Sequence, residues 1–134
     1  MATQTIVSGY IQSITKHNEV NKQYLDQLEL STSGHIKIVC QEIVGFGSSL
    51  FLLGGVLNLK SSEWLDYIKS LEPVLLKVKA FTVKINLENS DDEKLYSYEY
   101  INSSISENSV GGNWEKYLSK FNDDESELIE ILNL

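Results

Sequence analysis

The stretch from Ile43 to Leu59, IVGFGSSLFLLGGVLNL, constrains the fold more than any other part of the chain, because its seventeen residues include no charged side chain. A run of this composition has to be buried. Two arrangements are open: Gly54 and Gly55 form the turn of a hairpin between Leu50–Leu53 and Val56–Leu59, or the run is one long core strand with a glycine bulge. We favour the hairpin, since a Gly-Gly pair adopts the positive φ angles of a two-residue turn without steric cost.

The same stretch has apolar side chains at consecutive positions, as in Leu50–Leu53, so both faces of its strands need to be covered. Either other layers pack on both faces, or one face lines a cavity for an apolar ligand. The glycines that would make room for such a ligand are Gly45, Gly47, Gly54 and Gly55. A membrane span is not expected, because seventeen residues is at the lower limit for crossing a bilayer and the glycines and serines dilute the run.

Length and composition predict one globular domain over residues 1–134, large enough to bury a core without disulfides or metals. The net charge is −8, and residues 68–134 hold 7 lysines and 13 acidic residues against 4 and 6 in residues 1–67. All eleven basic residues are lysines. Without the planar guanidinium group of arginine, and with an acidic field, we do not expect a nucleic-acid partner.

The expected location is the cytoplasm. The N-terminal segment MATQTIVSGYIQSITK lacks the basic region and apolar run of a secretory signal. The single cysteine, Cys40, cannot form an internal disulfide, and proteins without disulfides are typical of a reducing compartment.

Three strands are expected up to the start of Ile43–Leu59, which we call the central stretch, because runs that contain β-branched and aromatic residues are separated by polar segments. The connection Lys16–Lys22 is polar. The three strands are Thr3–Thr15 with a bend at Gly9, Gln23–Leu30 with Tyr24, Asp26, Leu28 and Leu30 on one side, and His35–Ile43 after a turn at Ser31–Gly34.

After the central stretch the hydrophobic period becomes helical. The apolar positions are Trp64, Leu65, Ile68, Leu71 and Leu75, while Glu63, Asp66, Lys69 and Glu72 fall outside this stripe. Ser61 and Glu63 are typical of a helix N-terminus. Pro73 should either break this helix or begin a second short one.

The clearest local pattern is a hairpin. Phe81, Val83, Ile85 and Leu87 share one face, and Tyr96, Tyr98 and Tyr100 alternate with other residues after the polar segment Asn89–Glu93. A turn centred between Asp91 and Asp92 pairs Leu87 with Tyr96, Ile85 with Tyr98 and Val83 with Tyr100. A shift by one residue would put Glu99 on the apolar face, where an unpaired carboxylate is costly. The tyrosine row therefore belongs on the apolar face.

Two helices are expected after the polar loop Asn102–Gly112. The first has Asn113 as its N-cap and Trp114, Tyr117, Leu118 and Phe121 as its stripe; the second begins at Asp124, with Glu127 in capping-box spacing and Leu128, Ile131 and Leu132 as its stripe. The fold class predicted from all these elements is α+β. It consists of an antiparallel sheet of about six or seven strands with one central helix and one or two C-terminal helices.

No motif in the sequence carries a chemistry by itself. His17, His35 and Cys40 are too few and too scattered for a zinc site. The segment GFGSSL, from Gly45 to Leu50, lacks the third glycine of a dinucleotide-binding fingerprint, and no GK[ST] follows it. Cys40 lies among apolar strand residues, as inert core thiols do. We therefore expect no metal, no cofactor and no enzymatic activity.

The function that the sequence favours is a non-catalytic acidic protein-binding module, as immunity and antitoxin-type proteins are for basic toxins or nucleases. Acidic surface steers a basic partner and accelerates association. The candidate partner-binding residues form two clusters: Asp91, Asp92 and Glu93, and Asp123, Asp124, Glu125 and Glu127. Acidic clusters of this kind are also typical of solvated turns and helix starts.

The alternative function is a small apolar-ligand-binding domain with a pocket beside residues 43–59. Tyr96, Tyr98 and Tyr100 would form an aromatic wall of that pocket, and Gly54 and Gly55 would leave room for the ligand. The simpler interpretation of the tyrosines is core packing with hydroxyls at the sheet margin. The sequence does not indicate an oligomeric state.

Overall fold

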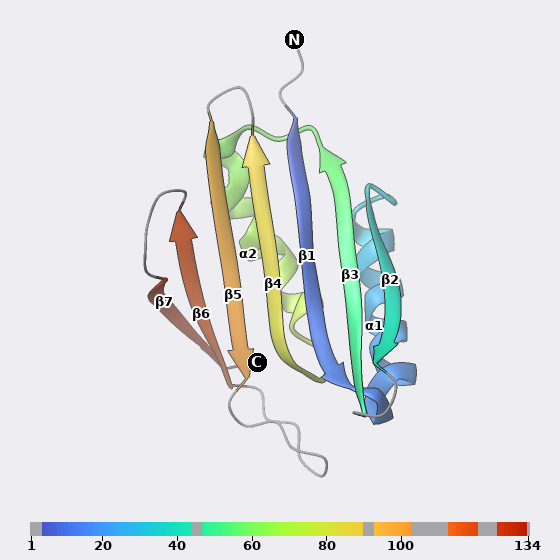
Figure 1. The fold of residues 1–134 in the computed structure, drawn as a ribbon. Helices are drawn as coiled ribbons and strands as arrows, with labels where there is room; N and C mark the ends of the chain where they lie inside the picture. The colour runs from blue at the N-terminus through green and yellow to red at the C-terminus, as the bar shows by residue number, and fades with distance from the viewer. Residues whose placement is uncertain (1–3, 44–46, 90–92, 103–112, 121–125, 134) are drawn as a thin grey trace.

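The structure is a computed structural model, which describes residues 4–43, 47–89, 93–102, 113–120 and 126–133. These residues form seven strands and two α-helices, each helix preceded by a short 3-10 helix (η) (Figure 1). The fold is therefore α+β, as predicted. In chain order the elements are β1 (Thr5–Ile14), η1 (Thr15–His17), α1 (Asn18–Ser31), β2 (Ile36–Ile43), β3 (Ser48–Leu57), η2 (Ser61–Glu63), α2 (Trp64–Leu75), β4 (Ala80–Asn89), β5 (Lys94–Asn102), β6 (Asn113–Lys120) and β7 (Glu127–Asn133).

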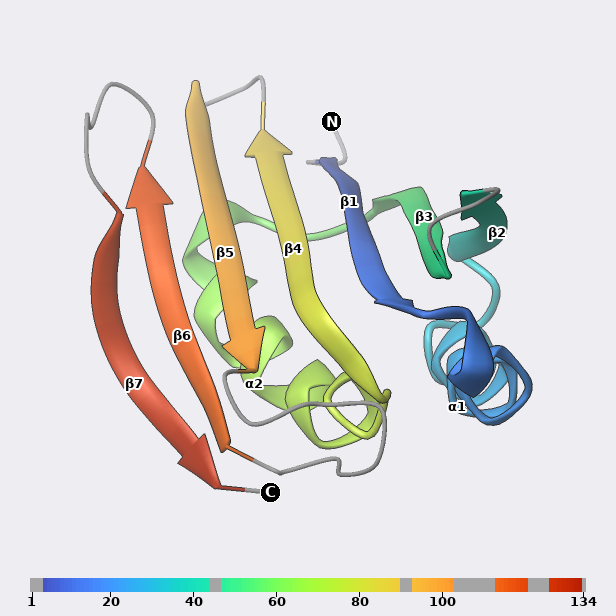
Figure 2. The ribbon, with the colours of Figure 1, turned by 60° about the horizontal axis from the view of Figure 1, so that its bottom comes forward.

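The strands form one sheet in the order β2-β3-β1-β4-β5-β6-β7, and every neighbouring pair is antiparallel. Both helices lie on the same face of this sheet, behind it in Figure 1 and below it in Figure 2. The core lies between that face and the helices, where alternate strand residues such as Val7, Ile11, Phe51 and Leu53 are buried. No helix within the described ranges covers the opposite face, which we call the open face, and none is long and apolar enough to cross a membrane.

The hairpin expected at Gly54 and Gly55 is wrong, because both glycines lie inside the continuous strand β3. Gly54 pairs with Ser8 of β1 and Lys37 of β2, and the register shows no irregularity at either glycine, so there is no bulge. Neighbouring strands bond both edges of β3, which favours an extended backbone over a turn. Gly55 serves another purpose: a Cβ atom at this position would overlap the carbonyl oxygen of His35, so glycine permits the close approach of β2.

The strand expected at Gln23–Leu30 is also wrong, since these residues belong to α1. The buried residues of α1 are Asn18, Asn21, Leu25 and Leu28, spaced three or four apart, whereas Leu30 is exposed. Two of the four core positions are polar, which hides the helical period in the sequence. Asn21 can be buried because its side chain accepts a hydrogen bond from Lys79 N (2.7 Å) and donates one to Lys79 O (3.0 Å).

The helix expected from Ser61 is confirmed as η2 followed by α2. Pro73 neither breaks it nor begins a second helix, because it lies in the last turn and α2 ends two residues later at Leu75. One position outside the apolar stripe, Glu72, is nevertheless buried. Trp64 is tied to the sheet by its indole nitrogen, which donates a hydrogen bond to Thr5 Oγ1 at 2.8 Å.

The β4–β5 pairing is confirmed in the predicted register: Leu87 with Tyr96, Ile85 with Tyr98 and Val83 with Tyr100. The expected turn residues Asp91 and Asp92 lie outside the described residues.

Neither predicted C-terminal helix is present in the described residues 113–120 and 126–133, which form β6 and β7 instead. The apolar spacing of Trp114, Tyr117 and Leu118 suggested a helix, but the residues of β6 that alternate toward the helices are Trp114, Lys116 and Leu118. A buried lysine interrupts the apolar alternation that would identify this strand. The expected start of the second helix, Asp124, lies outside the described residues.

Candidate functional site

On β1, β2 and β3 the open face carries four large aliphatic side chains that the helices do not cover. Ile6, Val39, Leu52 and Val56 keep exposed fractions of 49%, 63%, 47% and 46%. The register pairs Ile6 with Val56 and Leu52 with Val39, across three neighbouring strands. Directly paired side chains on one face touch each other, so these residues form two apolar pairs, separated by the row that contains Gly54. We call these four residues the aliphatic patch.

One carboxylate stands directly beside this patch on the same face, and two more lie further across the sheet. Glu88 of β4 pairs with Ile6, and Tyr10, which pairs with Leu52, is followed across the sheet by Lys84 and Glu99. We call Glu88, Glu99 and Glu115 the acidic border. On β4, β5 and β6 the open face carries these three carboxylates and one cation, Lys84, which gives this half of the face a negative balance.

Glu115, on β6, is the member of the acidic border with a side-chain partner. The Tyr117 hydroxyl donates a hydrogen bond to Glu115 Oε2 at 2.7 Å. This bond is the largest cause of a raised pKa for Tyr117, with burial and the charge of Glu115 adding to it. The Tyr117 phenol therefore remains a neutral donor at physiological pH.

Gly54 lies in the row between the two apolar pairs, flanked by Ser8 and Lys37. A Cβ atom added at Gly54 would meet only Val7 O within 4 Å, at 3.6 Å, which is an ordinary contact. Space above this glycine is therefore open, unlike the space at Gly55. A side chain could be added at Gly54 without disturbing the sheet.

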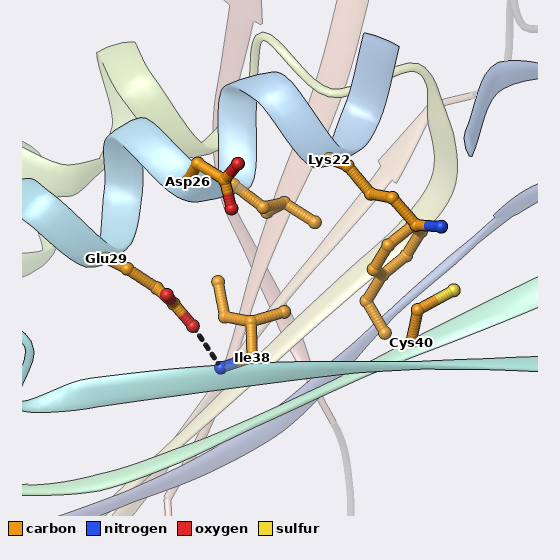
Figure 3. Close-up of a pocket in the computed structure, with 7 residues that line it drawn as sticks. Lys22, Asp26, Glu29, Ile38 and Cys40 are labelled. Atoms are coloured by element: carbon orange, nitrogen blue, oxygen red, sulfur yellow. Dashed lines mark hydrogen bonds between the residues drawn. The ribbon is translucent and has the colours of Figure 1, made fainter. Parts of the chain in front are cut away.

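A small pocket lies elsewhere, between α1 and β2 (Figure 3). Its volume is about 210 Å³, and Leu25, Ile38 and Phe51 supply apolar lining. Glu29 reaches down from α1, and its Oε1 accepts a hydrogen bond from Ile38 N at 2.7 Å. The remaining lining residues are Lys22, Asp26, Glu29 and Cys40. Pockets for drug-sized ligands span about 300–1,000 Å³, so this pocket alone is small for one.

A second pocket, of about 320 Å³, lies along the same helix and shares Asp26 and Glu29 with the first. Asp26 is exposed, and Glu29 is engaged by the Ile38 amide. Within the described residues, no three histidine, cysteine, aspartate or glutamate side chains are grouped as a metal site would require.

One polar cluster of the interior consists of Glu72, Tyr100 and Lys116. Glu72 Oε2 lies 2.6 Å from Lys116 Nζ and accepts a hydrogen bond of 2.6 Å from the Tyr100 hydroxyl. Burial, and then the hydrogen bond to Glu72, raise the pKa of Tyr100 far above its usual range. All three side chains are buried between α2 and the sheet, so they hold these elements together and present no group to a substrate.

The predicted partner-binding residues are only partly within the described chain. Asp91, Asp92, Asp123, Asp124 and Glu125 lie outside it. Glu93 is exposed just before β5, at the end of the sheet where Glu88 also lies. Glu127 pairs with Leu118, whose partner Tyr98 faces the helices, so Glu127 is not on the open face.

The tyrosines expected in a ligand pocket pack against the helical layer. Tyr98 and Tyr100 are buried, and the ring of Tyr96 meets Trp64 edge-on with 5.3 Å between the ring centres. Neither pocket beside α1 is lined by these tyrosines or by Gly54 and Gly55; the first touches the stretch 43–59 through Phe51 alone.

The aliphatic patch is the feature that sequence reasoning missed. Its signal in the sequence is the run of apolar residues at consecutive positions in Leu50–Leu53, which makes both faces of the strand apolar. The structure adds that one of the two faces of β3 receives no helix. Comparison of the chain with protein-family models, curated proteins and solved structures finds no significant match.

Proposed function

We propose that this chain is a non-catalytic binding module that docks a basic protein on the open face of its sheet, as an immunity or antitoxin-type inhibitor of a basic toxin or nuclease does. The observation that carries the proposal is that the aliphatic patch and the acidic border share one uncovered face of the sheet, with Glu88 directly beside Ile6. Exposed apolar patches that are rimmed by polar residues mark interaction surfaces.

The arrangement matches the anatomy of a protein interface, in which an apolar centre is surrounded by a polar rim. Burial of Leu52 and Val39 against a partner would supply affinity, since each square ångström of apolar surface removed from water contributes roughly 25 cal/mol. The carboxylates Glu88 and Glu99 would attract a basic partner and orient it. The net charge of −8 extends that attraction over the whole molecule.

The proposal moves the expected docking surface. Sequence reasoning assigned partner binding to the acidic clusters at residues 91–93 and 123–127, whereas the open face combines apolar and acidic groups on rigid strands. Glu93, at the end of the sheet near Glu88, extends the acidic border. A basic toxin or nuclease made in the cytoplasm, where we expect this chain to act, would meet this face before it reached its target.

The alternative, a small apolar-ligand-binding domain, is supported by the pocket between α1 and β2, which Phe51 of the central stretch helps to line. Its small volume makes it the weaker proposal. The two proposals place binding on opposite sides of the sheet, so one set of variants separates them.

The test begins with capture of basic proteins from an extract of the source cells on the immobilised chain. Leu52→Ser removes an aliphatic side chain that is 47% exposed on the open face, and Leu65→Ser removes one that is 51% exposed on α2. The partner should be retained by the native chain and by Leu65→Ser. We expect its affinity for Leu52→Ser to fall by about tenfold, which corresponds to ~1.4 kcal/mol.

Association rates of the purified partner then test the charged half of the surface. Glu88→Lys on the open face should slow association several-fold at low salt, and the difference should shrink as salt screens the charges. Asp26→Lys, beside the pocket, is the matched control and should leave the rate closer to native. A partner whose binding is weakened by Asp26→Lys but not by Leu52→Ser or Glu88→Lys would refute the open face as the docking site.

A further inference from the structure

The two edges of the sheet are built differently, and this difference is independent of the proposed function. At the β2 edge, side chains from α1 and the following turn occupy backbone amides. Glu29 Oε1 accepts a hydrogen bond from Ile38 N at 2.7 Å, and Thr32 Oγ1 accepts one from Ile36 N at 3.3 Å. These bonds use amides that an additional strand would need, and α1 lies beside this edge (Figure 1).

The β7 edge has no comparable protection in the part of the chain that the structure describes. β7 pairs only with β6, and it lies beyond the helical layer in Figure 2. Leu128, Ile129 and Ile131 keep exposed fractions of 49%, 41% and 60%. An extended strand that is exposed on both faces and paired along one edge is a template for another strand.

The sequence of β7, ELIEILN, carries few of the devices by which proteins block an edge, although one register irregularity interrupts its pairing with β6. It contains no proline and no lysine, and its only charged residues are Glu127 and Glu130. Glu130 is directed toward Lys116 of the neighbouring strand, with 4.0 Å between Oε2 and Nζ. The edge therefore offers backbone hydrogen-bonding groups and aliphatic side chains to an incoming strand.

We propose that β7 pairs antiparallel with β7 of a second copy of this chain, so that two sheets join into one continuous sheet across a two-fold axis. Such an interface is isologous, with the same patch contributed by each copy. The strand is self-complementary in the register that sets Leu128 of one copy opposite Ile131 of the other.

This register follows from the faces of the sheet. Leu128 pairs with Tyr117 and Ile131 with Glu115, two residues apart on β6, so both lie on the open face despite the irregularity between them. A two-fold axis perpendicular to the sheet brings open face to open face, and the four aliphatic side chains meet there.

The same register keeps carboxylates apart. It sets Glu127 opposite Leu132 and Glu130 opposite Ile129 of the other copy. A pairing centred on Glu130 would instead place the two Glu130 carboxylates directly opposite each other, which is destabilising. Each copy carries a charge of −8, so the two copies repel at long range and salt should strengthen this contact. Docking of a basic partner should respond to salt in the opposite way.

Sedimentation equilibrium over a range of protein and salt concentrations tests the proposal. The native chain should form dimers whose dissociation constant falls as salt rises. Ile131→Lys, at an exposed edge position, should be monomeric over the same range, while Leu65→Lys, at a similarly exposed position on α2, should dimerise like the native chain. A native chain that stays monomeric into the millimolar range, or an Ile131→Lys variant that dimerises equally well, overturns the proposal.

Disulfide trapping tests the register separately, in a Cys40→Ser background so that the native thiol does not contribute. A mixture of the Leu128→Cys and Ile131→Cys variants should yield a covalent dimer, because directly opposed residues have Cα atoms about 4.5–5.5 Å apart, within the range of a disulfide. Each variant alone should yield far less. Equal trapping by Ile131→Cys alone would show that the strands do not pair in this register.

Discussion

Lys116 of β6 and Glu72 of α2 form an ion pair inside the protein, with 2.6 Å between Nζ and Oε2. Lys116 is 1% exposed, and its ammonium group also lies 5.4 Å from the centre of the Tyr98 ring. Removing both charges from water is costly. The pair is tolerated because Tyr100 and Glu130 add further polar contacts to it. The contact joins the C-terminal part of the sheet to the helical layer.

Lys116→Met should destabilise the protein strongly, because the Glu72 carboxylate would stay buried without its cation. Loss of one partner of a buried pair costs about 3–5 kcal/mol. We expect a shift of this size in the free energy of unfolding, measured by urea titration.

The double variant Lys116→Met, Glu72→Leu is the control. Replacement of a whole buried ion pair by apolar residues of similar volume is often close to neutral. The double variant should therefore be more stable than Lys116→Met, although it also leaves the Tyr100 hydroxyl without its acceptor. Strictly additive effects of the two substitutions on the free energy of unfolding would contradict an energetic coupling between Lys116 and Glu72.

This ion pair also explains why β6 was predicted as a helix. The β4–β5 hairpin obeyed strict alternation, so the parity of Val83, Ile85 and Leu87 against the tyrosines was enough to predict its register. In β6 the residue that should continue the alternation is Lys116, and its partner Glu72 is 44 positions away in the chain, as 116 minus 72 gives. The hydrophobic periodicity of a segment does not reveal that one of its charged residues pairs with a residue far away in the sequence.

The candidate site was only half predictable for a related reason. The acidic balance and the two-faced apolar character of Leu50–Leu53 are properties of the sequence. Which face of β3 stays uncovered depends on both helices packing on one side, and that is a tertiary property. The sequence offers no distinction between Gly54 and Gly55, although the two positions lie on opposite faces of β3.

Alkaline pH should weaken the fold through Tyr98 and Tyr100. Burial raises the pKa of both phenols, and the hydrogen bond to Glu72 raises that of Tyr100 further. A raised pKa in the folded state means that the stabilisation is complete below the pKa of an unfolded tyrosine, about 10, and is lost as the pH rises above it. Each of the two phenols should lower the free energy of unfolding by up to ~1.4 kcal/mol per pH unit above that point.

Urea titrations of the native chain and of Tyr100→Phe at pH 8 and pH 11 measure this dependence. Tyr100→Phe should be less stable at the lower pH, because a hydrogen bond to a charged acceptor contributes about 1.5–3 kcal/mol. It should lose less stability than the native chain between the two pH values. An identical loss in both proteins would show that Tyr100 does not ionise on unfolding.

Gly54 and Gly55 provide a matched pair of alanine substitutions whose effects should have opposite signs. Gly55→Ala would drive its Cβ into the carbonyl oxygen of His35, which is backbone and cannot move without shifting β2. We expect a loss of about 1–3 kcal/mol in the free energy of unfolding, as for other overpacked sites.

The Cβ atom added by Gly54→Ala meets only the ordinary 3.6 Å contact with Val7 O, and the backbone φ of Gly54 is not in the positive region that favours glycine. Alanine restricts the unfolded chain more than glycine does, so Gly54→Ala should stabilise the protein by roughly 0.5 kcal/mol. Urea titrations of both variants beside the native chain decide the matter, and equal effects of the two substitutions would contradict the assignment of Gly54 to the open face and Gly55 to the helix-covered face.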